Sequence, residues 1–414
     1  MAMPIRINPY IPFAFIYFFV NAAGLPFGLL YTSLLAPFFY FWVLLKKRHE
    51  ILFPFLLFLL PFVVAHLNLE GLDRMQYLIT MLNLLTVYIF GQAFHTWLKT
   101  DQQKERILRI LLYTNALLCG IAMLFYFTPL QSIFWSRQNL TSDVTDFLRL
   151  KMFTYEPSYY ALLFVPLFLY FFLQYIFRQN QIRSSLLLIM LFLPFILSFS
   201  IGVIICLLAA GFCCLIIRLP DLYRNRRIVN GFINTLFVTI LLLMIAGIFF
   251  PDNPLFIRIE NILAGNDSSA EGRTGDAFII ARQLLDQGNA YWGIGAGQLE
   301  LAGADLIRGY YLYYHNTPVA IPNAAAETLA LFGWLGFGLR MGIECLLFLL
   351  TKPWKNYYRL ILFFFVFLYQ FTGSYITNVA EYVLWILAFT NAFPAFDISA
   401  AHQRKASALL RTGS

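Results

Sequence analysis

The chain has 414 residues, is 60% hydrophobic and only 12% charged, and carries a formal net charge of +8. A soluble globular domain has about 25% charged residues, so half that share with long apolar runs excludes an ordinary soluble domain and predicts a protein of the lipid bilayer. The basic residues stand in short clusters between the apolar runs, which favours membrane orientation over nucleic-acid binding as their explanation. We therefore expect no nucleic-acid partner.

Apolar runs of about 20 residues predict an all-α polytopic membrane protein with about twelve transmembrane helices. The first run follows Arg6 and is succeeded at once by a second, which favours a signal anchor over a cleaved secretory signal. The run from Ser184 to Arg218 is divided at Ser198-Phe199-Ser200-Ile201-Gly202, where we expect a tight turn. The predicted spans are 9–25, 27–45, 51–67, 76–98, 107–127, 158–177, 184–199, 200–218, 229–250, 325–350, 357–376 and 379–396.

These spans divide the chain into four parts. Residues 1–250 hold the first nine helices with short loops, 251–325 form one large polar loop with short amphipathic helices, and 326–398 hold the last three helices. Residues 399–414 form a polar tail that we expect to be cytoplasmic and disordered. Basic clusters such as Lys46-Lys47-Arg48 fall on one side of the membrane, which the positive-inside rule makes the cytoplasm. Both termini are then cytoplasmic, and the loops at 128–155 and 251–325 face the opposite side.

The large loop contains four arginines, Arg258, Arg273, Arg282 and Arg308, and no lysine. Arginine is always charged and its planar fork binds phosphate oxygens in bidentate fashion, so these residues suggest an anionic ligand such as a lipid pyrophosphate. The alternative is that the arginines pair with lipid headgroups or with carboxylates of the loop. The carboxylates considered for this are Glu260, Asp267, Glu271, Asp276 and Asp286.

Gly272-Arg273 stands at the start of an amphipathic run that ends near Gln287. Thr274 or Asp276 can cap this helix, which would leave Arg273 beside a helix N-terminus that also favours an anion. Arg282 lies nine residues further on, about 13 Å along a helix, so the two arginines need not bind the same phosphate.

A glycine-rich turn, Gly293-Ile294-Gly295-Ala296-Gly297, follows and would let a ligand approach the backbone closely. No strand precedes it, so it is not a dinucleotide-binding fingerprint. Aromatic residues then gather before the chain re-enters the membrane. They suit either a membrane interface or a surface that packs against sugar rings, and comprise Tyr310, Tyr311, Tyr313, Tyr314 and His315.

Polar residues also occur at membrane depth. Asn323 can cap the helix that follows the loop, and Glu327 would lie one turn inside it, where a carboxylate is costly unless it is paired or functional. Glu156 opens the sixth span at the side of the membrane that the large loop faces, so a shared site is plausible. Arg340 and Glu344, spaced i, i+4, predict a structural ion pair in the tenth helix. Five cysteines and five histidines are scattered, and we expect neither a disulfide framework nor a metal site.

Taken together, these residues make the chain similar to the Wzy-type polysaccharide polymerases and the related O-antigen ligases. Four short motifs in one order carry the resemblance: Tyr155-Glu156-Pro157-Ser158; Gly272-Arg273 followed by the glycine-rich turn; Asn323 ten residues before Gly333, with Gly336 after it; and Gly373-Ser374 with Glu381 leading the final span. The ligases usually have histidine immediately before the asparagine, whereas this chain has Pro322, which favours a polymerase. Ile201 also stands where the family often has arginine.

The resemblance implies a GT-C-like glycosyltransferase architecture in a bacterial inner membrane, with the active site facing the periplasm. The substrates would be donor and acceptor oligosaccharides on polyprenyl diphosphate, and a chain-length regulator is a further expected partner. Arg273 would be the main diphosphate contact and Glu327 or Glu156 the base, with His315 as the remaining choice for that role. Additional substrate contacts are expected from Arg282, Arg258, Arg308, Asn323, Tyr313, Tyr314 and Glu381.

Such a reaction needs cations for the leaving diphosphate and one base, and no metal or other cofactor is expected. An O-antigen ligase is the first alternative, and a transporter or flippase of lipid-linked sugars is the second. Transporters of that kind tend to show repeated halves, which this sequence lacks. A non-catalytic scaffold would not need a loop whose basic residues are all arginine.

Overall fold

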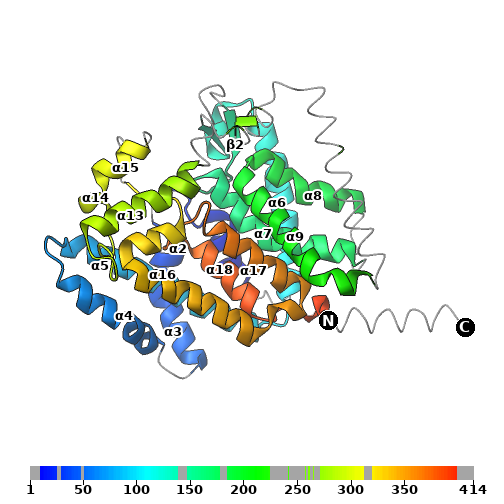
Figure 1. Cartoon of the computed structure of the whole chain (residues 1–414). Coiled ribbons are helices and arrows are strands. Elements are labelled where there is room, and N and C mark those ends of the chain that lie inside the picture. Colours follow the sequence, from blue (N-terminus) through cyan, green and yellow to red (C-terminus); the bar gives the residue numbers. More distant parts are fainter. Residues whose placement is uncertain are drawn as a thin grey trace, which may run out of the picture.

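The computed structural model describes residues 10–25, 29–47, 51–138, 147–177, 184–223, 271–311 and 319–398, with single positions at 241, 257, 260, 261 and 264. Within these ranges the chain is mostly helical (Figure 1). The helices of the first part are α1 (Ile11–Phe15) continued by the π-helical turn η1 (Ile16–Val20), α2 (Tyr31–Leu34), α3 (Ala36–Lys47), α4 (Leu52–Leu67), α5 (Arg74–Thr100) and α6 (Lys104–Phe125). Those of the second part are α7 (Pro157–Ile176), α8 (Ser184–Ser198), α9 (Ile201–Tyr223), α13 (Ala277–Gln287), α14 (Leu299–Ala302), α15 (Ala304–Tyr310), α16 (Ala324–Thr351), α17 (Tyr357–Tyr369) and α18 (Val379–Phe389).

Five helices in the described ranges are long and apolar enough to cross a membrane: α5, α6, α7, α9 and α16. Five shorter apolar helices of 10–17 residues lie at Ile11–Val20, Leu52–Leu67, Ser185–Ser198, Tyr357–Tyr369 and Val379–Phe389. Large apolar side chains of α4 are exposed, among them Phe53 at 66% and Leu57 at 56%, as expected for a surface that contacts lipid. The protein is therefore a helical membrane protein.

Several predicted spans form shorter or broken helices. The span predicted at 27–45 is interrupted at Leu35, between α2 and α3. The span predicted at 357–376 ends at Tyr369, because the residues that follow bond to other parts of the chain. The count of about twelve spans thus stays a prediction. The span predicted at 229–250 lies outside the described residues except for Leu241, and the tail 399–414 lies wholly outside them.

The turn expected between α8 and α9 is confirmed. α8 ends at Ser198 and α9 begins at Ile201, and Phe199 between them has a φ of 52°. Side-chain caps mark other helix starts. Asp73 accepts from the backbone N–H groups of Met75 (2.9 Å) and Gln76 (3.1 Å) at the start of α5.

A short two-stranded antiparallel hairpin, which the sequence does not predict, accompanies the helices. It follows the 3-10 turn η2 (Pro129–Ile133) and consists of β1 (Trp135–Gln138) and β2 (Phe147–Leu150), with Trp135 opposite Leu150. Trp135 donates through Nε1 to the carbonyl of Ala122 in α6 at 2.8 Å, which fixes the hairpin to the helices. Strands of four residues are too short to show a reliable alternating pattern in sequence.

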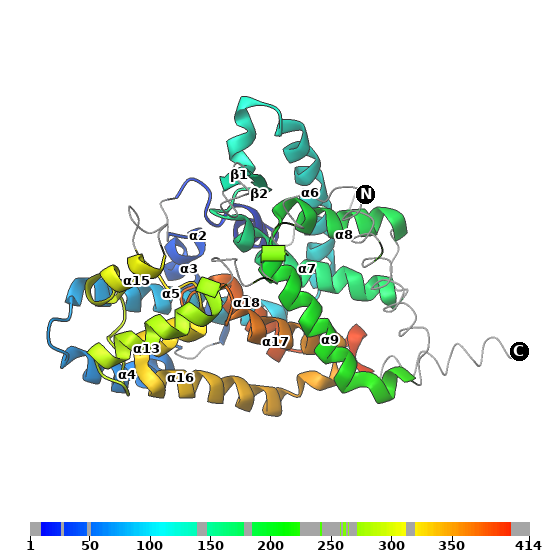
Figure 2. The same cartoon turned by 45° about the horizontal axis from the view of Figure 1, so that its top comes forward.

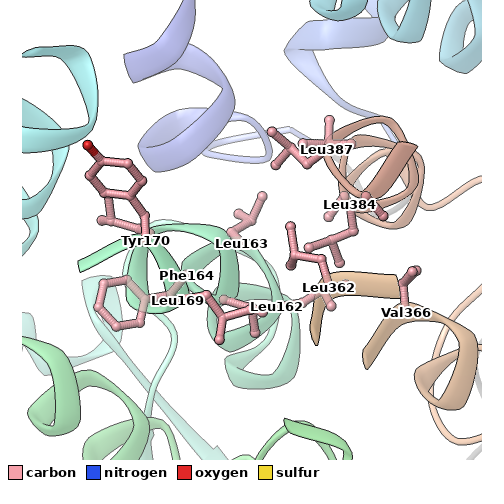
Figure 3. Close-up of a cluster of buried hydrophobic side chains, with 14 of the residues drawn as sticks. Leu162, Leu163, Phe164, Leu169, Tyr170, Leu362, Val366, Leu384 and Leu387 are labelled. Carbon is pink, nitrogen blue, oxygen red and sulfur yellow. The ribbon is translucent and has the colours of Figure 1, made fainter. Parts of the chain in front are cut away.

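The hydrophobic core is centred on α7, α17 and α18. Figure 3 shows Leu162 and Leu163 of α7 on the side of the helix that faces α17 and α18, where Leu362, Val366, Leu384 and Leu387 are drawn. Phe164 points away from these residues, and its ring packs against Phe195 of α8 with the ring centroids 5.4 Å apart. These side chains are almost fully buried. In Figures 1 and 2, α17 and α18 lie between two groups of elements, one formed by α6–α9 with the hairpin and the other by α13–α16 with α4 and α5. Side chains from both groups can therefore meet at the ends of α17 and α18.

Candidate functional site

The segment at residues 370–378, here called the linking segment, joins α17 to α18 and is held by polar contacts from α16. Asn323 donates through Nδ2 to the carbonyl of Phe371 at 2.7 Å. The backbone N–H of Ile376 donates to Oε2 of Glu327 at 2.8 Å. These bonds replace the helical bonds that would have extended α17, and they fix the linking segment against the start of α16.

Asn323 connects three parts of the chain. Its side-chain oxygen accepts from the N–H of Ala326 at 2.9 Å, so the predicted cap of α16 is confirmed. Its Nδ2 bonds to Phe371 and also to the carbonyl of Arg273 at 2.9 Å. The residue is 0% exposed. Asn323 therefore holds Arg273 and the linking segment together, and its expected role in substrate binding stays a prediction.

Arg273 lies within a helical segment, not ahead of one. The π-helical turn η3 (Gly272–Asp276) runs directly into α13, and Glu271 before it already has helical torsion angles. Neither Thr274 nor Asp276 caps α13 through its side chain, so that part of the prediction was wrong. The Tyr311 hydroxyl donates to the carbonyl of Gly272 within this helical turn.

The guanidinium of Arg273 lies against the linking segment. A Cβ atom built at Gly373 would be 3.4 Å from Arg273 Nη1 and 3.5 Å from the hydroxyl oxygen of Tyr369. The cation and the hydroxyl thus flank the same point of the linking segment. Arg273 itself is partly exposed.

Glu156 reaches the same neighbourhood from α7. The electrostatic environment of the Tyr369 hydroxyl includes both Glu156 and Arg273. Glu156 is partly exposed, and one of its carboxylate oxygens accepts a hydrogen bond from the Ser158 hydroxyl. Burial, and next the charge of Glu156, raise the pKa of Tyr155 well above its ordinary value, so that hydroxyl keeps its proton. Arginine, carboxylate and neutral tyrosine hydroxyls are therefore grouped at the ends of α7 and α17.

The glycine-rich turn contacts the protein's own backbone rather than a ligand. Gly293, Gly295 and Gly297 all have positive φ, and a Cβ at Gly293 would lie 2.5 Å from backbone atoms of Leu331. The N–H of Ile294 bonds to the carbonyl of Ala330 at 3.0 Å. The expectation that a ligand approaches this turn is corrected, since α16 occupies the space.

The turn docks where α16 is interrupted. Gly333, with φ 66° and ψ −170°, breaks the helix, and a Cβ there would lie 2.3 Å from the backbone of Tyr291. The N–H of Trp334 instead bonds to the carbonyl of Ala290 at 3.0 Å. The loop thus supplies the hydrogen bonds that the broken helix loses, as buried backbone groups require.

The predicted Arg340–Glu344 ion pair is present, with Arg340 Nε 3.3 Å from Glu344 Oε1. Arg340 also pairs with Glu381 of α18, and it donates to Gln370 Oε1 at 2.7 Å. Glu381 is 1% exposed and accepts from Trp385 Nε1 at 3.4 Å. Glu381 therefore belongs to a buried ion pair, and the substrate contact expected there stays a prediction.

Two of the other expected contacts, Arg308 and Arg282, lie in the described residues. Arg308 pairs with Glu300, and the second carboxylate oxygen of Glu300 accepts from the N–H of Val319. This arginine therefore agrees with the alternative that the loop arginines pair with loop carboxylates, although Glu300 was not among the partners named for it. Arg282 lies on the exposed face of α13. The remaining candidates lie outside the described residues: Arg258, Tyr313, Tyr314 and His315.

No family model and no curated protein sequence matches this chain. The fold defines a helical membrane protein, and the assignment of a function rests on the geometry around Arg273, Glu156 and Tyr369.

Proposed function

We propose that the protein is a membrane glycosyltransferase that polymerises a polysaccharide from repeat units carried on polyprenyl diphosphate. One observation carries the proposal: Arg273 and Glu156, from separate parts of the chain, both contribute to the electrostatic environment of the Tyr369 hydroxyl, and Arg273 Nη1 and that hydroxyl flank Gly373. A cation beside a carboxylate base is the minimum equipment for transferring a sugar from a diphosphate.

Arg273 would bind the diphosphate of the donor. An arginine guanidinium forms charge-assisted, bidentate bonds with phosphate oxygens, and Arg273 is partly exposed beside the linking segment. The negative charge that develops on the leaving diphosphate would be stabilised there without protonation. No metal is needed in this scheme.

Glu156 is the better candidate for the base, and Glu327 is not suited to it. Glu327 is 8% exposed and its carboxylate accepts from Ile376, so it positions the linking segment. Glu156 is partly exposed and oriented by Ser158. It would take the proton of the acceptor hydroxyl while that oxygen bonds to the anomeric carbon and the carbon–oxygen bond to the diphosphate breaks. The direct displacement would invert the anomeric centre.

The proposed setting is a bacterial inner membrane crossed by about twelve helices, with both termini in the cytoplasm. The large loop at 251–325 and the site would then face the periplasm, in a GT-C-like arrangement. The substrates are lipid-linked donor and acceptor glycans, and a chain-length regulator is a proposed partner. The basic clusters between spans support this orientation.

A reconstitution experiment tests the proposal. Purified protein in liposomes is given polyprenyl-diphosphate-linked repeat units, and the glycans are separated on a gel; a ladder indicates polymerisation. Arg273→Ala is expected to lower the rate by a factor on the order of 100 to 1,000, the usual effect of removing one group that stabilises a developing charge. Arg282→Ala removes the same charge from the exposed face of the adjoining helix and serves as the matched control.

Full polymer length with Arg273→Ala would refute the assignment of the site. Transfer only to a lipid A core acceptor would indicate a ligase instead. Linkage analysis of the product by NMR tests the inversion, and retention at the anomeric carbon would rule out direct displacement.

A transporter of lipid-linked sugars is the second candidate, and one observation favours it. α16 is interrupted at Gly333 and carries the buried charges Arg340 and Glu344. Interrupted helices and buried charge are features of transport sites. Movement of the lipid-linked unit across the liposome membrane without any covalent change would decide for transport.

A further inference from the structure

The buried side chains around Arg340 contain more acid than base. Glu327 and Glu344 of α16 and Glu381 of α18 surround Arg340, and all three carboxyl groups are at most 8% exposed. If all were ionised, three negative charges would face one positive charge. The titratable groups that face them from the packed elements are these four and Tyr382 of α18, whose hydroxyl donates to the carbonyl of Ile376.

Hydrogen bonds and ion pairs compensate the negative charges of the three carboxyl groups to different extents. Glu381 forms the closest ion pair with Arg340. Glu344 has Arg340 at 3.3 Å and also accepts from Gln370 Nε2 at 2.8 Å. Glu327 has one hydrogen bond, from the backbone of Ile376, and no salt bridge among the described residues. Glu327 is therefore the carboxyl group whose charge is least compensated.

A second observation points to a missing positive partner. The Oε2 atom of Glu381 is fully buried and has no hydrogen-bond partner among the described residues. An ionised carboxylate in a low-dielectric interior is costly when its oxygens are not all satisfied, and the usual outcome is that a neighbouring acid takes up a proton. The cluster thus lacks positive charge and donors while it holds excess acceptors.

We propose that the Arg340 cluster is a proton-binding site and that Glu327 holds the proton at neutral pH. A neutral Glu327 still accepts the Ile376 hydrogen bond through its carbonyl oxygen, and it removes one of the two excess negative charges. The proposal goes beyond the glycosyltransferase function and does not depend on it.

A proton fits this cluster better than a metal ion does. Within the described ranges, no three side chains of histidine, cysteine, aspartate or glutamate converge as metal ligands. Arg340 pairs with both Glu344 and Glu381 and already supplies the cation between them. A metal ion in that place would need carboxylate oxygens that Arg340 does not occupy. A proton needs no such space.

Loss of the proton would place a new charge next to the linking segment. Glu327 bonds to Ile376, and Gly373 of the same segment lies against Arg273. The protonation of Glu327 therefore controls how firmly the segment is held beneath Arg273. The expected consequence is a dependence of the Arg273 environment on pH.

Infrared spectroscopy of the purified full-length protein tests the proposal. The sample is kept at neutral pH in a detergent without ester groups, because ester carbonyls absorb close to protonated carboxylic acids. The wild type is expected to show a carboxylic acid carbonyl band that shifts in D₂O and disappears as the pH is raised. Glu327→Gln is expected to lose this band, whereas Asp286→Asn, on the exposed face of α13, keeps it.

Several outcomes would overturn the proposal. One is a wild-type spectrum without a carboxylic acid band at neutral pH, which needs no variant to interpret. Another is a band that survives in Glu327→Gln and vanishes in Glu344→Gln or Glu381→Gln. A third is loss of the band when NaCl replaces choline chloride at constant pH, which would identify the site as a cation site.

Discussion

Replacing Gly333 by alanine should destabilise the protein far more than the same change at Gly338, five residues further along α16. The Gly333 backbone has φ 66° and ψ −170°, a conformation almost restricted to glycine, and forcing another residue into it costs about 1–3 kcal/mol. The new Cβ would lie 2.3 Å from the backbone carbonyl of Tyr291, where only a backbone shift can relieve the clash. Such overpacking costs about 1–3 kcal/mol more.

The shift would also weaken the hydrogen bonds that join the loop to the broken helix. Four such bonds link residues 290–295 to α16, at 3.0–3.2 Å, and a net loss of about 1 kcal/mol for each bond that breaks is typical. Strain and overpacking together give an expected loss in unfolding free energy of about 2–6 kcal/mol, and each of these bonds that breaks adds about 1 kcal/mol.

Gly338→Ala is the matched control. It lies in the same helix, a Cβ there meets nothing within 4 Å, and alanine is the better helix former by about 1 kcal/mol. Thermal and denaturant unfolding of both variants in detergent, with limited proteolysis of the loop, measures the difference. Equal stability of the two variants would refute the account of Gly333 and the docked loop.

Two further substitutions test contacts of the site. Arg340→Met removes the cation shared by Glu344 and Glu381 and should lower the unfolding free energy by about 3–5 kcal/mol, because it leaves two buried carboxyl groups without their partner. The double variant Arg340→Met with Glu381→Gln should recover part of this loss. No recovery would contradict the pairing. Asn323→Ala removes the cap of α16 and both hydrogen bonds from Nδ2, and should lower the unfolding free energy by at least the roughly 1 kcal/mol of a lost cap. The expected readouts are a lower unfolding midpoint and faster proteolysis near Arg273. An unchanged midpoint would show that the three contacts are dispensable.

Hydropathy and capping located much of the helical structure from sequence. The apolar runs at 76–98, 107–127 and 158–177 correspond to α5, α6 and α7, and the expected break after Ser198 is present. Asn323 was recognised as a cap, and Arg340 and Glu344 as a pair, because both features depend on residues three or four positions apart. Such short-range interactions are visible in any single sequence.

The sequence-based predictions are wrong at positions whose structure depends on residues far away in the chain. The glycine-rich turn was read as an opening for a ligand, yet its glycines are required because α16 passes directly against them. The apolar character of the linking segment predicts a membrane span that continues to residue 376. α17 instead ends at Tyr369, because Asn323 and Glu327, some fifty residues away, bind that segment. No pattern within the segment itself indicates these bonds.

From the sequence alone we predict a helical membrane protein and the positions of most of its helices. The sequence also indicates Arg273 and Glu156 as candidate site residues. The tertiary structure decided which of the polar residues are structural: Asn323, Glu327, Glu381 and Arg308 all have partners inside the protein. The physical reason is that burial in a bilayer and helix capping are local properties of a segment. The partner of a charged side chain depends on how separate helices pack, and only that packing brings Arg273 and Glu156 to the same tyrosine.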